Sequence, residues 1–258
     1  MLGKWGLLTL AFLLALAACA FWIDAMGPST KPAVVRLQFV VVLLVLLGLC
    51  VVAGLIVHGR IDGVLIDERN RVSLARFQWV LWFLVILSGY FTEAIWNAAK
   101  EADLPTIQNQ LVALLGITSG SAVISSLITD AKKATPPPVA SVVVASANAA
   151  AVPPRPCPAC QLGAMACHAD PDNASWSDLY TGEEAGNFGV VDVSRLQKLV
   201  VTILLVMAFV VFLWGKLGEA ASAAALAMPE FDENGSFLWL LGISHAAYLA
   251  QKATPKPV

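Results

Sequence analysis

Charged residues are scarce in this chain, and their scarcity argues against an ordinary soluble domain. Asp, Glu, Lys and Arg make up 13% of the 258 residues, whereas a soluble globular domain carries roughly 25%. The missing charge leaves several long, uninterrupted apolar segments, which are typical of a polytopic membrane protein. The lipid bilayer is therefore the first partner that the sequence predicts.

Several functional signatures are also missing. The net charge is −2 and no basic patch is interleaved with aromatic residues, so we expect no nucleic-acid binding. No nucleotide-binding glycine loop is present. The chain has three histidines, and no nucleophile–histidine–acid set can be assembled from them convincingly. The sequence therefore predicts a protein that is not an enzyme.

Six apolar segments approach the length that a membrane-spanning helix needs, about 20 residues for roughly 30 Å of hydrocarbon. They are residues 5–23, 34–57, 77–96, 107–128, 199–214 and 237–250. The last segment is the shortest. The predicted fold class is all-α, a polytopic membrane helix bundle of about six transmembrane helices.

Basic residues in the connecting loops predict the orientation. Lys and Arg gather near residue 4 and in 60–76, 132–198 and 252–256, and with six spans all four regions fall on one side. Because basic loops prefer the cytoplasm, we predict a multi-pass inner-membrane protein with both termini cytoplasmic. An alternative stays open, since Leu16-Ala17-Ala18-Cys19 resembles a lipobox whose cleavage would leave five spans.

An internal repeat organises the remainder of the chain. Leu-Leu-Gly-Ile-Thr at 114–118 recurs as Leu-Leu-Gly-Ile-Ser at 240–244, and Lys-Ala-Thr-Pro follows each copy. An Arg-x-Gln opens the apolar run before each copy, so the pattern predicts a tandem two-helix hairpin with parallel copies. The predicted regions are an N-terminal transmembrane pair at 1–60, a first hairpin at 72–130, a cytoplasmic Pro/Ala-rich linker with a cysteine-containing loop at 131–194, and a second hairpin at 195–258.

Small and polar residues within the returning helices are the candidates for pore lining or helix packing. Small residues four positions apart let helices approach closely, within one chain or between copies. The hydroxyls of the fourth segment either make interhelical contacts or line a wetted surface, and an intramembrane histidine either bonds to a hydroxyl or is functional. Glu93 lies where it can reach the membrane interface. The candidates are Gly116, Gly120, Ser119, Gly242, His245 and Ala246.

The loop at 131–194 carries a candidate zinc site. Cys157 and Cys160 form a Cys-x-x-Cys pair, and Cys167 and His168 follow. Thiolate and imidazole suit zinc, although adjacent Cys and His are awkward ligands for one tetrahedron. The alternative is a flexible loop with reduced thiols.

We expect the protein to be an oligomeric pore or channel-like component regulated by its cytoplasmic loop, with homo-oligomerisation through the small-residue faces. The alternative is a membrane anchor or scaffold that recruits a soluble cytoplasmic partner through residues 131–194. A third class is a small membrane enzyme that uses His168 and loop acids around a metal.

Overall fold

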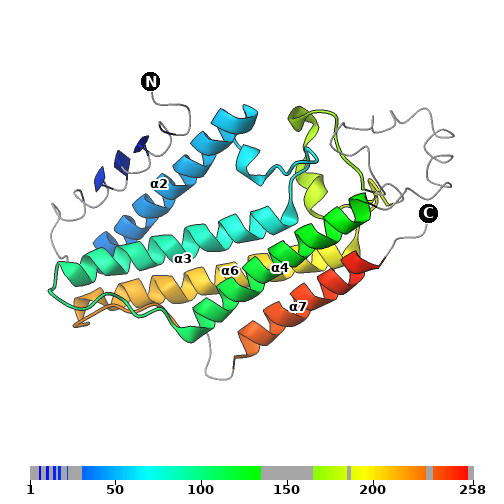
Figure 1. Cartoon of the computed structure of the whole chain (residues 1–258). Helices are drawn as coiled ribbons and strands as arrows, with labels where there is room; N and C mark the ends of the chain where they lie inside the picture. The colour runs from blue at the N-terminus through cyan, green and yellow to red at the C-terminus, as the bar shows by residue number, and fades with distance from the viewer. Residues whose placement is uncertain are drawn as a thin grey trace, which may run out of the picture. The chain divides into compact units, whose positions relative to one another are not determined.

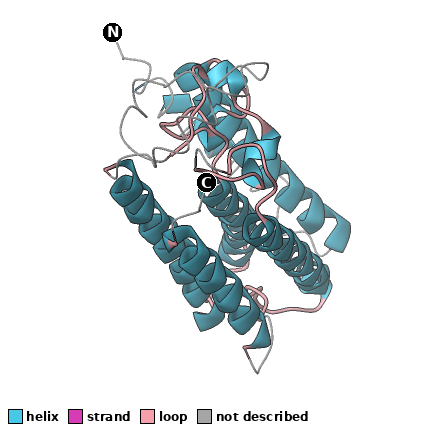
Figure 2. Cartoon of the chain, turned by 90° about the vertical axis from the view of Figure 1, so that its right-hand side faces the viewer, coloured by secondary structure: helices cyan, strands magenta, loops and turns pink. Residues whose placement is uncertain are grey.

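The computed structural model describes residues 31–134, 165–184, 187–230 and 235–254 continuously, with eight isolated positions between 6 and 22. Regular structure within these residues is helical, and the β-bridges are isolated pairs (Figures 1 and 2). The all-α expectation therefore holds for the part of the chain that is described. The long helices are α2 (Pro32–His58), α3 (Leu74–Ala98), α4 (Asn109–Lys133), α6 (Val193–Gly218) and α7 (Ser236–Ala253).

Four of these helices, α2, α3, α4 and α6, are long and apolar enough to cross a membrane. They are the helices of a multi-pass membrane protein. Helix α7 has 18 residues and reaches about 27 Å, slightly less than the roughly 30 Å of hydrocarbon. The first predicted span, at 5–23, lies outside the continuously described residues, so the number of six stays a prediction.

Local sequence explains where α2 begins and ends. Pro32 occupies the first turn, where its missing N–H is not needed and its fixed φ suits a helix. Gly59 adopts φ 71° and donates its N–H to the carbonyl of Leu55, which is the left-handed cap that glycine adopts without strain. The helix is thus delimited by the backbone properties of two residues, and the apolar sequence between them sets its membrane character.

The described residues form two compact units. Unit 1 comprises Met1–Ile61, Val80–Leu115 and Leu204–Leu238, and unit 2 comprises Asp62–Trp79, Gly116–Ile203 and Trp239–Val258. Helices α3, α4, α6 and α7 each contribute residues to both units. The two units differ in what they bury, and each is described separately.

Unit 1 has an apolar interior. Val42 and Leu46 on α2 pack with Leu84 on α3. The Trp82 ring lies 6.1 Å from Phe209 and 6.4 Å from Phe237, centroid to centroid. Apolar side chains also cover the outside, including Leu44, Leu47, Val211 and Phe212, as expected where a helix surface faces lipid.

Unit 2 has a polar interior. Helix α4 buries a stripe of hydroxyl side chains at helical spacing, and its opposite face exposes apolar side chains. Figure 1 shows α4 beside α7 here, and the buried face of α7 carries Leu241, Ser244, His245 and Tyr248. The buried α4 stripe consists of Thr118, Ser121, Ser125 and Thr129, and the exposed face includes Val123, Ile124 and Leu127.

Residues that the repeat aligns occupy different surroundings. Arg76 is exposed whereas its counterpart Arg195 is buried. Gln78 is buried whereas Gln197 is exposed. The tandem hairpin stays a prediction from the sequence, because its two Arg-x-Gln copies lie in different surroundings.

Candidate functional site

The candidate site is the polar interior of unit 2, and a buried lysine is its centre. Lys198 on α6 is 1% exposed. Its Nζ donates to Ser121 Oγ on α4 at 3.2 Å and lies 4.0 Å from the centroid of the Tyr248 ring on α7. Among the described residues no carboxylate forms an ion pair with Lys198. The Lys198 amino group is therefore contacted by a hydroxyl and an aromatic face, and no carboxylate among the described residues is paired with it.

Hydroxyl groups continue from this lysine toward the end of α7. Ser125 Oγ accepts a hydrogen bond from Lys252 Nζ at 2.7 Å and lies 3.4 Å from the Tyr248 hydroxyl. On the α3 side, Gln78 Nε2 donates to Thr202 Oγ1 at 2.5 Å. These contacts favour the interpretation of the polar α4 face as an interhelical contact, since its hydroxyls bond across to neighbouring helices.

Two polar side chains in the same interior have no hydrogen-bond partner among the described residues. Both ring nitrogens of His245 and the hydroxyl of Ser244 are buried and unbonded. Their residues are 2% and 4% exposed. The structure therefore does not show the hydroxyl bond considered for His245 from the sequence. Buried donors and acceptors without partners are rare in folded proteins, so these two side chains are candidates for a functional role.

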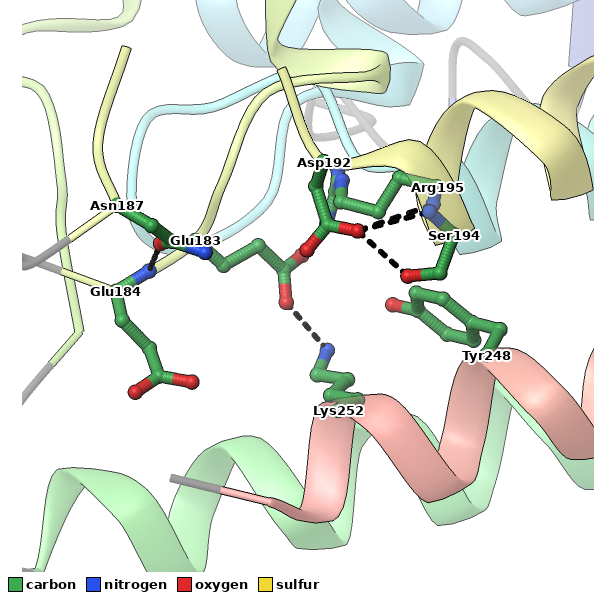
Figure 3. A pocket seen from close by; sticks show the side chains of 8 residues that line it. All are labelled: Glu183, Glu184, Asn187, Asp192, Ser194, Arg195, Tyr248 and Lys252. Carbon is green, nitrogen blue, oxygen red and sulfur yellow. Dashed lines mark hydrogen bonds and ion pairs between the residues drawn. The ribbon is translucent and has the colours of Figure 1, made fainter. Parts of the chain in front are cut away.

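A carboxylate gathers three cations where α6 and α7 meet the loop. Glu183 pairs with Arg195, with Lys252 at 2.7 Å and with Arg69 at 3.2 Å. Figure 3 shows the Glu183 carboxylate directed toward Lys252 on the last turn of α7. Burial alone would raise the pKa of Glu183, but Arg195, Arg69 and Lys252 hold it well below its usual range. Glu183 is therefore ionised at neutral pH.

A tight turn between η1 (Gly63–Leu65) and α3 presents Arg69 to this carboxylate. Asp67 Oδ2 accepts hydrogen bonds from Arg69 Nε at 3.0 Å and Nη2 at 2.7 Å. Asn70 adopts φ 55°, a left-handed conformation that asparagine tolerates, and its side chain donates to the carbonyl of His168 at 3.1 Å. The turn thus orients an arginine and ties the loop to the start of α3.

A second buried acid organises the loop itself. Asp178 in η4 (Trp176–Leu179) accepts from Arg71 Nε at 3.3 Å and lies 3.2 Å from His168 Nε2. Its other oxygen accepts from the backbone N–H of Ser175 at 3.0 Å, which completes a capping box. Burial raises the pKa of Asp178, but the bond from His168 and the Arg71 charge lower it below its usual value.

The predicted zinc ligands are only partly described. Cys167 is buried, and His168 is engaged with Asp178 and packs against the Phe188 ring at 5.8 Å. Cys157 and Cys160 lie outside the described residues. Where side chains are described, no group of three or more His, Cys, Asp or Glu could hold a metal, so the zinc site stays a prediction.

A small cavity of about 20 Å³ lies beside Glu183 in unit 2. A space of this size accommodates about one water molecule. Figure 3 shows the side chains that surround it. The lining residues are Glu183, Glu184, Asn187, Asp192, Ser194, Arg195, Tyr248 and Lys252. The cavity therefore gives unit 2 room for about one water molecule beside Arg195 and Lys252.

The small residues predicted to pack helices do not do so within the described chain. A Cβ added at Gly116, Gly120 or Gly242 would meet no atom within 4 Å. Ser119 is partly exposed and Ala246 is exposed. These positions therefore leave helix surfaces open to lipid or to a second copy.

Sequence reasoning missed Lys198 and Glu183 as site residues. Lys198 was counted among the flanking basic residues because the apolar run begins at Leu199, but α6 begins at Val193, more than one turn earlier. That start places Lys198 inside the helix. Glu183 gives no local signal, because Arg69, Arg195 and Lys252 come from three distant parts of the sequence.

Comparisons with protein-family models, with curated proteins and with solved structures find no match to this chain. The function is therefore argued from the geometry of unit 2. Among the described residues its interior offers a lysine amino group without a carboxylate partner, hydroxyl groups and an unbonded imidazole, and these groups can donate hydrogen bonds to a small anion.

Proposed function

We propose that the protein is a channel-like membrane component whose unit 2 interior admits a small anion, and that the loop regulates entry. The observation that carries the proposal is Lys198, a fully buried ammonium in a membrane helix with no ion-pair partner among the described residues. Ionisable residues without a partner are rare in membrane helices and usually belong to an ion or substrate path. A charged Lys198 would cost several kcal/mol in isolation, so an anion beside it would favour the charged form of its amino group.

The groups around Lys198 determine which ion is favoured. Ser121 and Ser125 supply hydroxyls, and His245 supplies a ring nitrogen that no described residue uses. Hydroxyl and N–H groups can replace the hydration shell of an anion by donating hydrogen bonds. A cation in the same place would be repelled by Lys198. The proposed cargo is therefore a small inorganic anion.

The loop supports regulation because it supplies the acid that neutralises the cations at the end of the helices. Glu183 holds Arg195 of α6 and Lys252 of α7 together. While Glu183 is paired with Arg195 and Lys252, an incoming anion must compete with its carboxylate for these two cations. A movement of the loop that withdraws Glu183 would leave both cations available to an anion. The contact would then have two states, paired and open, and would control entry of the anion.

Anion conductance of the full chain in planar bilayers tests the proposal. Wild-type protein should carry current whose reversal potential in a salt gradient follows the anion. Lys198→Met should abolish this current, because methionine keeps the volume and removes the charge. The matched control is Lys100→Met, which removes a lysine that lies over the Trp96 ring in unit 1 and should leave the current unchanged. The sequence candidates Ser119→Leu and His245→Leu are tested in the same assay.

Two results would contradict the proposal. One is a current that follows the cation in a salt gradient, and the other is an anion current that survives Lys198→Met. Native mass spectrometry of the purified protein tests the oligomeric part separately. A discrete oligomer would support a channel assembled from several copies, whereas a monomer that conducts would show that one chain suffices.

A second candidate function is the membrane anchor. The observation that favours it is the ordered loop, which residues 66–72 hold through the Asn70–His168 and Arg71–Asp178 contacts. A fixed surface of this kind suits recognition by a soluble partner. Deleting residues 136–164 should leave this surface intact, and loss of a co-purifying partner only on further deletion to 190 would place the binding surface in the ordered part.

A further inference from the structure

Glu93 is the unusual side chain of unit 1. It lies on α3 and is 0% exposed, and neither carboxylate oxygen has a hydrogen-bond partner among the described residues. The sequence allows Glu93 to reach the membrane interface, but the structure encloses its side chain within unit 1. A buried carboxyl without a donor needs a separate explanation.

Three polar side chains close to Glu93 on α3 do have hydrogen-bond partners. Thr92 Oγ1 donates to the carbonyl of Ser88 at 2.8 Å, and the Ser88 hydroxyl donates to the carbonyl of Leu84. Asn97 donates to the carbonyl of Leu226 at 2.9 Å and accepts from its N–H at 2.7 Å. The bundle thus provides partners for neutral polar groups close to Glu93 in sequence, and it provides none for Glu93.

The charged groups of unit 1 do not neutralise Glu93. Lys216 on α6 is the cation whose field acts on it, but its Nζ lies 3.1 Å from Glu219 and nearly half of its side chain is exposed. Arg36 on α2 donates to the carbonyl of Trp214 at 3.1 Å. Lys100, beyond the end of α3, lies over the Trp96 ring. Within the described residues none of these cations pairs with Glu93.

An ionised carboxylate in this position costs several kcal/mol, because it has lost its water and gained no partner. Binding a proton removes that cost and turns the group into a neutral acid. We propose that Glu93 is a proton-binding site within the membrane, occupied at neutral pH, and that it is the carboxyl at which a hydrophobic carbodiimide modifies this protein. The inference does not rest on anion conductance.

The chemistry of the modification requires the protonated form. The carboxyl proton moves to one nitrogen of the carbodiimide, and the carboxylate oxygen bonds to the central carbon. The acyl group then migrates to the second nitrogen and leaves a stable N-acylurea. All atoms of both reactants stay in the product, so no oxidant or leaving group is involved. A hydrophobic reagent dissolves in lipid and reaches an acid that water does not.

Peptide mass spectrometry after dicyclohexylcarbodiimide treatment of the full chain in lipid vesicles tests this. At neutral pH we expect one adduct per chain on the peptide that contains Glu93, declining at alkaline pH. Glu93→Gln should lose this adduct. The matched control is Glu101→Gln, which removes an exposed acid just beyond α3 and should keep the adduct in full. A water-soluble carbodiimide with an amine nucleophile should modify Glu101 and spare Glu93.

The proposal is overturned if Glu93 carries no adduct at neutral pH in correctly folded protein. Hydrogen exchange of the α2 and α3 peptides establishes that fold before labelling. Modification of Glu93 by the water-soluble reagent, to the same extent as Glu101, would also overturn it, since the carboxyl would then be hydrated. Neither result bears on Lys198, so failure here and failure of the anion conductance are distinguishable.

Discussion

Unit 1 and unit 2 present the same kind of surface and bury opposite kinds of side chain. Both expose apolar residues on their helices, such as Val211 in unit 1 and Leu127 in unit 2. Unit 1 fills its interior with aromatic and aliphatic groups around Trp82, whereas unit 2 buries hydroxyls and the ammonium of Lys198. Contact with lipid requires apolar side chains on the outside of both units. The buried side chains are free of this requirement, and they are where the two units differ.

The two interiors are also stabilised by different forces. In unit 1 the packing of rings such as Trp82 and Phe209 supplies dispersion attraction, which acts between close-packed atoms and does not depend on pH. In unit 2 the acids Glu183 and Asp178 hold basic residues from separate segments. Buried ion pairs leave a large penalty when one member is removed. Substitutions that remove a buried charge should therefore destabilise unit 2 more than unit 1.

The largest expected effect is that of Glu183→Gln, which keeps the side-chain volume and removes the charge that Arg69, Arg195 and Lys252 share. Breaking a buried pair by removing one partner costs about 3–5 kcal/mol. Hydrogen exchange measured by mass spectrometry should rise in peptides covering residues 165–184 and the start of α6. Peptides of α2 in unit 1 should stay protected.

The matched control is Glu219→Gln in η5 (Glu219–Ala221), directly after α6. Glu219 pairs with Lys216 at 3.1 Å, but both side chains are about half exposed, and exposed pairs contribute little to stability. Hydrogen exchange should not change. Equal loss of protection in both units after Glu183→Gln would mean that they unfold together, and the proposed difference in their stabilisation would then fail.

Lowering the pH should destabilise unit 2 as Glu183→Gln does, but by a smaller amount. The pKa values of Glu183 and Asp178 are lowered in the folded chain from their ordinary values of 4.5 and 3.8. Stability from these groups is fully present above the ordinary values and is lost as the pH falls through the folded-state values. Each unit of pH removes at most about 1.4 kcal/mol per group, so at pH 4 the loss should not exceed about 1 kcal/mol.

Hydrogen exchange labelled after short incubations at decreasing pH measures this loss. Unit 2 peptides should lose protection below the ordinary glutamate pKa of 4.5, and unit 1 peptides should not. Loss of protection in unit 2 between neutral pH and pH 5 would instead indicate a different titrating group, and it would remove Glu183 from the explanation.

The sequence predicted the helices better than the site, for a physical reason. Apolar run length is a local property, so the segment predicted at 34–57 closely matches α2 at Pro32–His58. The partners of Glu183 lie far apart in sequence, at Arg69, Arg195 and Lys252, and no periodicity links them. His245 was found from the sequence because a histidine in an apolar segment is itself a local signal.

The smallest expected effect compares one helical glycine of unit 2, Gly116, with one of unit 1, Gly89. A Cβ at Gly116 meets no atom within 4 Å, whereas a Cβ at Gly89 would lie 2.8 Å from Leu213 Cδ2. Alanine in a helix is favoured over glycine by about 0.5–1 kcal/mol, so Gly116→Ala should stabilise the chain by that amount in thermal unfolding. Gly89→Ala should gain less, because the Leu213 side chain must shift.

Gly116→Leu extends this comparison to the assembly. Within one chain the Cβ meets no atom within 4 Å, and leucine, like alanine, favours a helix more than glycine does, so the monomer should be at least as stable as the wild type. If copies associate through the face that carries Gly116 and Gly120, leucine blocks close approach of the helices, and native mass spectrometry should show a smaller oligomeric fraction than for Gly116→Ala. An unchanged oligomeric fraction would place the contact between copies elsewhere, and the small-residue face would then be a lipid-facing surface of unit 2.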